Sequence, residues 1–153
     1  MLFFSVNAQE ADKWENWKPF IGNWSGEGNG IPGEGTGSFS FAFDLKENIL
    51  VRKSDYNYLG DKIYTTFSDV MVIYLVNGTP SKAIFFNDDG FSRIYSISYS
   101  DKTITLISEK LPLTPIFRLI YTIIDDSNIA LKFEIARDGV NFTTYSEETG
   151  KKK

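Results

Sequence analysis

Short segments in which apolar and polar residues alternate fill most of the chain from Gly22 onward. Alternation with a period of two is typical of a β-strand that buries one of its faces. The breaks between the segments contain Gly, Asn and Asp, which supply the turn conformations that hairpins require. The pattern predicts ten strands, at residues 22–28, 36–45, 49–58, 63–76, 82–87, 91–100, 103–110, 116–124, 129–136 and 142–147.

The predicted strands are joined by connections of only a few residues, so consecutive strands must pair with each other as an antiparallel meander. An open sheet with that many strands would present two unpaired edges, and closure into a barrel removes them. We therefore predict an all-β fold, a closed antiparallel barrel of about ten strands that forms a single domain over residues 9–150.

A short helix is predicted ahead of the first strand. Asp12 has the position of a helix cap with Glu15 three residues later, and Pro19 prevents the helix from continuing. Trp14 and Trp17 then share one face of the helix. Since so short a helix is not stable alone, we expect it to cap one mouth of the barrel.

Alternation also predicts which side chains face the lumen. In the segment 36–45 the phenylalanines occupy one face and small residues the other, and burial favours the phenylalanines inward by roughly 2 kcal/mol each. In the segment 49–58 the charged residues Lys53 and Asp55 mark the outer face. The residues predicted to face inward include Phe39, Phe41, Phe43, Leu50, Arg52, Ser54, Tyr56, Tyr58, Leu131, Phe133 and Ile135.

The segment 116–124 is apolar on both faces. Its second face carries Ile120 and Ile124 around Arg118, and an apolar outer face needs a cover. Either the N-terminal helix or a second subunit in a homodimer supplies that cover.

Arg52 is the strongest candidate for a functional residue. An inward guanidinium requires an anionic or hydrogen-bonding partner to offset its desolvation. Either the carboxylate of a bound ligand supplies that partner, or the protein does through Asp69 or Asp44. The predicted ligand-binding residues are Arg52, Tyr56, Phe41, Tyr95 and Met71.

The composition excludes several kinds of partner and catalytic site. The net charge of −4 arises from 16 basic and 20 acidic residues mixed along the chain, which argues against nucleic acid as a partner. The chain has no cysteine and no histidine, which removes disulfides, Ser-His-Asp triads and the usual zinc and heme ligands. The acidic pairs Asp88-Asp89 and Asp125-Asp126 lie at predicted turns, and we assign them to turn chemistry rather than to a metal. No metal site and no cofactor are expected.

The two ends of the chain carry further expectations. Residues 1–8 are apolar and end in Val-x-Ala, like the tail of a secretory signal peptide, but they lack its basic start. A periplasmic or secreted location follows if this segment is a signal-peptide remnant, and a cytoplasmic one if it is an ordinary terminus. No stretch has the length of a membrane span. Residues 147–150 read as a frayed end that leads into a basic tail at 151–153.

The stretch Gly22-Asn23-Trp24-Ser25-Gly26-Glu27-Gly28 resembles the first strand of the calycins, the lipocalin-like superfamily, and especially of nitrobindin-like heme-binding barrels and their bacterial relatives. The resemblance implies that Arg118 stacks on Trp24 and closes the barrel base. It also implies a ligand carboxylate held by lumen Arg and Tyr, as in fatty-acid-binding relatives, or a heme held by a histidine. Because this chain has no histidine, only a tyrosinate such as Tyr121 or Tyr145 stays chemically open as a heme ligand.

From these features we expect a barrel that binds a small apolar or amphipathic molecule without transforming it. One alternative is an isomerase or cyclase that uses Asp69, Asp44 or Tyr56 for proton transfer. Another is a solid barrel, filled by its phenylalanines, that serves as a scaffold for protein contacts.

Overall fold

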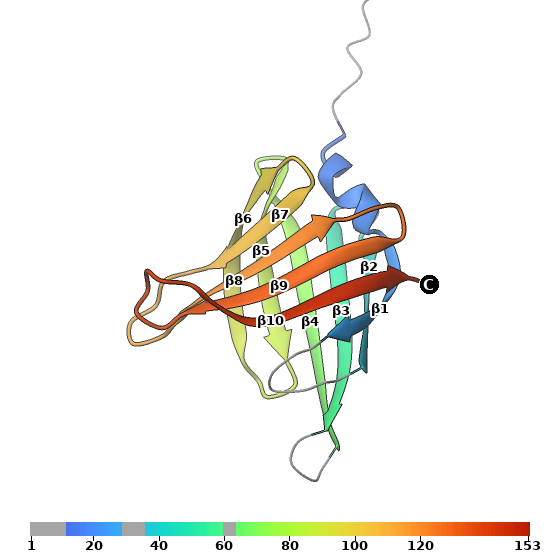
Figure 1. Ribbon diagram of the computed structural model, residues 1–153. Helices are drawn as coiled ribbons and strands as arrows, with labels where there is room; N and C mark the ends of the chain where they lie inside the picture. Colours follow the sequence, from blue (N-terminus) through green and yellow to red (C-terminus); the bar gives the residue numbers. More distant parts are fainter. Residues whose placement is uncertain (1–11, 29–35, 60–63) are drawn as a thin grey trace, which may run out of the picture.

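The computed structural model describes residues 12–28, 36–59 and 64–153, and side chains except those of residues 27, 28, 36, 58, 59, 64 and 65. These residues form one short 3-10 helix and ten strands, and the predicted fold class is confirmed (Figure 1). The elements are η1 (Glu15–Phe20), β1 (Gly22–Gly28), β2 (Thr36–Asp44), β3 (Ile49–Leu59), β4 (Tyr64–Val76), β5 (Thr79–Asn87), β6 (Ser92–Ser100), β7 (Thr103–Ser108), β8 (Ile116–Ile123), β9 (Asn128–Ala136) and β10 (Thr143–Lys152).

The strands form a closed barrel in which each strand pairs with its sequence neighbours and β1 pairs with β10. Every pairing is antiparallel, as short connections require. The register between strands places paired residues on the same face of the sheet. One row of paired residues that points into the barrel runs across β2 to β6 and consists of Phe41, Arg52, Met71, Phe85 and Arg93.

The C-terminal segment differs from the prediction. The expected frayed end at 147–150 and the basic tail are wrong, because β10 continues through Lys152 and pairs with β1. The glycine at position 150 explains how the strand fits. A Cβ atom there would lie only 2.7 Å from Cζ of Phe39, so the absence of a side chain makes room for the Phe39 ring.

One end of the barrel is sealed by η1, as the paired tryptophans predict (Figure 1). The Trp17 ring packs against Phe20, Phe41 and Tyr121, with ring centroids 5.7 to 6.5 Å apart. Its indole N–H donates to the Tyr99 hydroxyl at 2.7 Å. The helix is therefore held by tertiary packing, as its length demands.

We call the opposite end of the barrel the distal end. Near η1, inward side chains such as Leu50 and Ile73 are fully buried. Toward the distal end, the inward residues Phe85, Phe117 and Phe133 are only partly buried. The hydrophobic core thus fills the barrel from η1 inward, with partly buried side chains around it at both ends, including Phe43 and Tyr99 beside η1.

Candidate functional site

The inward guanidinium of Arg52 is paired inside the protein. Its Nη1 lies 2.6 Å from Oδ1 of Asp69 on the neighbouring strand β4, and Ser54 donates to the same oxygen at 2.9 Å. Arg52 and Asp69 are both buried. Burial by itself would lower the pKa of Arg52, but the charge of Asp69 together with smaller contributions from Tyr121, Tyr56 and Glu148 outweighs burial and raises that pKa. Of the two alternatives for Arg52, the geometry supports internal pairing with Asp69.

The pair extends into a hydrogen-bond network across the lumen. Nη2 of Arg52 donates to the Tyr56 hydroxyl at 3.2 Å, and that hydroxyl donates to Oε1 of Glu148 at 2.8 Å. Burial raises the pKa of Glu148, against the opposing hydrogen bond from Tyr56. Tyr56 and Glu148 form a tyrosine–carboxylate contact of the kind that proton transfer in an enzyme would need. The Tyr56 hydroxyl, however, already accepts a hydrogen bond from Arg52 and donates one to Glu148. The geometry of the network is that of a structural element.

Phe41 and Met71, two of the predicted ligand-binding residues, lie in the dense core. The Phe41 ring packs against Trp17 and Tyr121 at centroid distances of 5.7 and 5.5 Å. Met71 is fully buried opposite Arg52 in the sheet register. Neither side chain has a surface that a ligand reaches while the η1 half of the barrel keeps this packing.

Tyr95, the remaining predicted residue, lies two positions from a second buried arginine on the same face of β6. This is Arg93, whose exposed fraction is 6%. Its guanidinium carbon lies 5.0 Å from the centroid of the Phe91 ring and 5.5 Å from that of Phe117. Arg93 thus lies against two aromatic rings that pack edge to face on each other, and their π faces favour a cation.

The partners of Arg93 are neutral. Nη1 donates to the Thr114 hydroxyl at 3.2 Å, and Nε is a buried donor without a partner. Among the described residues, the ion pairs do not include Arg93. The Tyr95 hydroxyl likewise forms no hydrogen bond within the described part of the chain. Arg93 and Tyr95 therefore offer unused polar groups beside partly exposed aromatic rings.

Those rings form a continuous chain at the distal end. Each ring packs on the next at centroid distances of 5.7 to 6.2 Å, and Phe133 meets Tyr145 at a bulge in β10. We call the following set the distal site: Phe85, Phe91, Arg93, Tyr95, Phe117, Phe133 and Tyr145.

The sequence prediction missed Arg93, although a signal for it exists. Within the predicted strand 91–100, Arg93 has the same alternation phase as Tyr95, Ile97 and Tyr99, which are apolar or aromatic. An arginine in phase with a core face is predicted to point inward. The reasoning that selected Arg52 therefore applies equally to Arg93.

Arg118 does not stack on Trp24. Arg118 lies on the outer face of β8, where its Nε is 2.5 Å from Oε2 of Glu134 and its guanidinium carbon lies 3.8 Å from the centroid of Phe142. Trp24 is on the inner face and donates its indole N–H to the Phe20 carbonyl at 2.8 Å. The cation over its ring is Lys152, with Nζ 5.4 Å from the centroid. Strand alternation separates the two residues, because Arg118 is out of phase with inward Tyr121.

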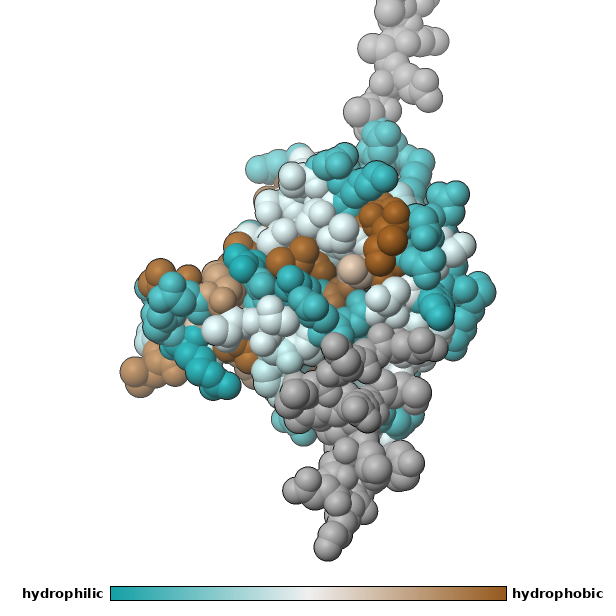
Figure 2. Space-filling view, in the orientation of Figure 1, coloured by the Kyte–Doolittle hydropathy of each residue, from teal (hydrophilic) through white to brown (hydrophobic). Residues whose placement is uncertain are grey.

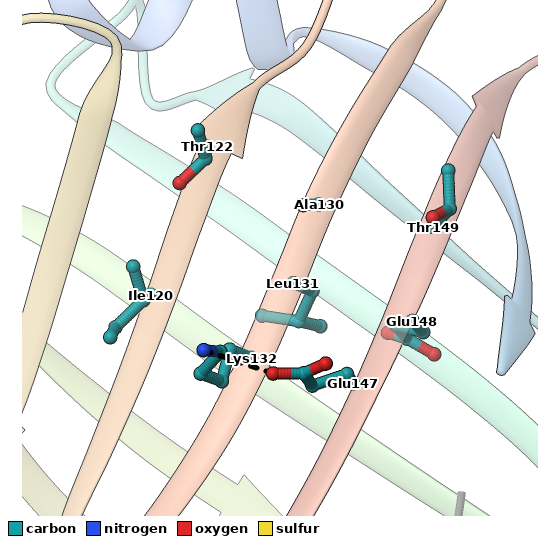
Figure 3. Close-up of a pocket in the computed structure, with 8 residues that line it drawn as sticks. All are labelled: Ile120, Thr122, Ala130, Leu131, Lys132, Glu147, Glu148 and Thr149. Carbon is teal, nitrogen blue, oxygen red and sulfur yellow. Dashed lines mark ion pairs between the residues drawn. The ribbon is translucent and has the colours of Figure 1, made fainter. Parts of the chain in front are cut away.

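The apolar outer side of β8 borders a shallow hollow on the outer face of β8 to β10 (Figure 3). Ile120 lines this hollow, next to an ion pair of 2.9 Å between Lys132 and Glu147. The predicted cover by the N-terminal helix is therefore wrong, since η1 packs into the barrel end. In Figure 3, Leu131 and Glu148 lie behind the strands, on the lumen side.

The described residues contain no cluster of three or more acidic side chains that would hold a metal ion. Asp125 and Asp138 bind backbone N–H groups of their own turns instead. No helix in the described ranges combines the length and hydropathy of a membrane span.

Among solved structures, the chain is similar to Rv2717c from M. tuberculosis. The TM-score is 0.65 with 15% sequence identity, over 94% of this chain and 98% of that chain. The likeness shows the barrel fold. No protein-family model matches the chain, and no curated protein matches it.

Proposed function

We propose that the barrel binds a small amphipathic anion at the distal site, with the anionic group on Arg93 and the apolar part against the aromatic chain. The observation that carries this proposal is Arg93 itself, a buried guanidinium with a free Nε and no carboxylate partner among the described residues. A desolvated cation of this kind gains most from an anion that accepts its unused hydrogen bonds.

The surroundings of Arg93 support an amphipathic ligand over a small inorganic anion. Phe91 and Phe117 contact the guanidinium, and Phe133 and Tyr145 continue the aromatic surface away from it. A ligand with an apolar tail removes this partly exposed surface from water, at about 25 cal/mol for each Å² buried. The hydroxyl of Tyr95 supplies a second donor for the head group.

The same residues fit a heme poorly. The chain has no histidine, and the polar groups of the distal site are a guanidinium and phenol hydroxyls. Burial raises the pKa of Tyr95, so its hydroxyl keeps its proton and is a poor ligand for iron. The proposal therefore involves no cofactor.

The test compares dodecanoate with dodecanol, which differ in head-group charge and share one apolar tail. Isothermal titration should give a Kd for dodecanoate that rises about 10- to 100-fold in Arg93→Met, because a hydrogen bond to a charged group contributes about 1.5–3 kcal/mol. Dodecanol affinity should change little. Arg137→Met, which removes an exposed arginine, is the matched control.

A thermal melt of each variant separates loss of binding from loss of folding, and Arg93→Lys tests whether charge alone restores affinity. Equal losses of dodecanoate and dodecanol in a folded Arg93→Met protein would show that Arg93 does not select the anion. Failure of the parent protein to bind dodecanoate would refute the proposal.

A further inference from the structure

Two loops meet at the distal end of the barrel. Ile116, the first residue of β8, pairs with Ala136, the last residue of β9. The β7–β8 loop (109–115) therefore enters at the point where the β9–β10 loop (137–142) leaves, and a Cβ built on Gly139 would lie 3.9 Å from Cδ1 of Ile116. Figure 1 shows both loops projecting from the same end of the molecule.

These loops expose large apolar side chains. Leu113 is 105% exposed, Val140 74% and Leu111 44%. We call these three residues the apolar tip. In Figure 2, apolar surface is exposed at the end of the molecule where the two loops lie, next to hydrophilic surface. Exposed apolar residues clustered at one protruding end mark an interaction site more often than the same residues scattered singly.

Neither solvation nor backbone conformation favours a leucine at position 113. Its φ is 58°, in the left-handed region where glycine or asparagine is preferred. Pro112 precedes it in a turn closed by the Thr114 N–H, which donates to the Leu111 carbonyl at 3.4 Å. The turn holds Leu111 and Leu113 outward from a fixed backbone rather than folding them onto the barrel.

We propose that the apolar tip docks on the surface of a lipid bilayer, from which the barrel takes up its amphipathic ligand; this inference rests on the function proposed above. Phe117, near the start of β8, and Phe133, on β9, lie next to the two loops along the chain. Their rings stack on each other and belong to the distal site, so the loops border that site. Docking there places the entrance of the site against the phase in which an amphipathic molecule is most concentrated.

The shape and charge of the tip select a lipid surface over a protein partner. Three side chains on convex loop tips bury far less than the roughly 1,200 Å² of total surface that stable protein interfaces begin at. The charges of the two loops cancel, with Glu109 and Asp138 against Lys110 and Arg137. Docking should then depend on apolar insertion and show little preference for anionic lipid.

The β7–β8 loop also connects the tip to the anion-binding residue. Thr114, the hydrogen-bond partner of Arg93, directly follows Leu113. Insertion of Leu113 into the bilayer therefore acts on the segment that holds the Arg93 guanidinium, at the position where the ligand head group arrives.

The experiment is flotation of the ligand-free full chain with phosphatidylcholine vesicles. The parent protein should float with the vesicles, and Leu113→Asp with Val140→Asp should lower its partition coefficient at least tenfold. The matched control is Leu45→Asp with Ile124→Asp. Leu45 is 63% exposed with φ 48° and Ile124 is 51% exposed. Leu45 lies in the β2–β3 turn, which η1 touches through a Trp14 hydrogen bond to Glu47. The control should float like the parent, because Leu45 and Ile124 lie in connections between strands, away from the apolar tip. Asp tolerates the left-handed conformation at both Leu45 and Leu113, so neither double variant should lose its fold on that account.

Three results would overturn the inference: no flotation of the parent, equal loss in both double variants, or flotation only with anionic vesicles. A shift from dimer to monomer in Leu113→Asp, seen by analytical ultracentrifugation without vesicles, would assign the tip to a second copy and also overturn it. Dodecanoate titration without vesicles tests the proposed function separately, so failure of docking and failure of ligand binding are distinguishable.

Discussion

At the scale of single residues, the barrel offsets the desolvation of two buried arginines in different ways. Arg52 has Asp69 as an anionic partner at 2.6 Å, so its charge is neutralised within the protein. Arg93 contacts two aromatic rings that pack on each other, and it donates to a threonine hydroxyl. Aromatic faces contribute about 0.5–2 kcal/mol to a cation, less than a buried carboxylate does. Arg93 therefore keeps its charge available for an anion, whereas the charge of Arg52 is already paired with Asp69, although the Nε of Arg52 is also a buried donor without a partner.

Breaking the Arg52–Asp69 pair should be costly for stability. Arg52→Met leaves a buried carboxylate without its cation, and Asp69→Leu leaves a buried guanidinium without its anion. Each single variant is expected to lose about 3–5 kcal/mol of unfolding free energy in urea titrations. The double variant should lose much less, because an apolar pair replaces both charges. A double loss equal to the sum of the single losses would show that the two side chains do not act as a pair.

Glu148 should make stability fall as the pH rises. Burial raises its pKa in the folded state, so the native protein retains a proton that the unfolded chain releases. Unfolding free energy then declines from about pH 4, near the unfolded pKa, up through the folded pKa. Glu148→Gln, which still accepts the Tyr56 hydrogen bond, should have a flatter profile in urea titrations across this range.

Asp138 provides the contrast for that measurement. Backbone N–H groups of Asn141 and Val140 lower its pKa to about 2, so its contribution is present above about pH 4 and is lost as the pH falls toward 2. Asp138→Asn should alter only the acid side of the profile. If Glu148→Gln leaves the slope above pH 4 unchanged, Glu148 is not the titrating group.

Alternation in the sequence placed Arg52, Tyr56 and Leu131 on the inner face, and the structure agrees. What alternation does not contain is the register between strands. The position of Asp69 beside Arg52, and of Phe91 and Phe117 around Arg93, depends on pairings between separate strands and on loop paths. The choice between the two arginines therefore required the three-dimensional arrangement.

At the scale of the elements, glycines in the strands leave space for particular inward side chains. A Cβ atom at Gly37 on β2 would lie 2.1 Å from Cδ1 of Tyr56 on β3. The Tyr56 ring thus lies across the backbone of the neighbouring strand, which brings its hydroxyl to Glu148. The pairing of β2 with β3 at this position therefore depends on the packing of the Tyr56 ring against the Gly37 backbone as well as on the hydrogen bonds between the two strands.

Gly37→Ala should displace the Tyr56 ring and cost about 1–3 kcal/mol, the usual range for overpacking. Gly26→Ala is the matched control, because its Cβ would first meet a flexible carboxylate oxygen of Glu148 at 3.1 Å. In a Tyr56→Ala background the added penalty of Gly37→Ala should disappear, as a double-mutant cycle in urea would measure. An unchanged penalty there would point to backbone effects in β2 instead.

At the scale of the whole molecule, closure of the barrel depends on the last residues of β10. All five registered pairs between β1 and β10 involve residues 148–152, from Gly28 opposite Glu148 to Trp24 opposite Lys152. The sequence prediction ended this strand at residue 147, because the run of Glu, Thr, Gly and Lys has little β propensity. Residues 148–152 form a strand despite this low propensity, because their pairing with β1 removes the unpaired edge of that strand.

A chain that ends at Glu147 tests this account directly. It keeps the pairing of β9 with the first half of β10 but loses every pair with β1, the Lys152 contact on Trp24 and the Glu148 hydrogen bond from Tyr56. Two unpaired strand edges then replace a closed sheet, and a net stability of about 5–15 kcal/mol does not withstand that loss. We expect a non-cooperative urea transition and loss of near-ultraviolet circular dichroism. Deletion of Lys153 alone, which removes one backbone hydrogen bond to Asn23, should leave a cooperative transition near the parent midpoint. A cooperative transition at the parent midpoint in the shorter chain would mean that the barrel is stable as an open sheet.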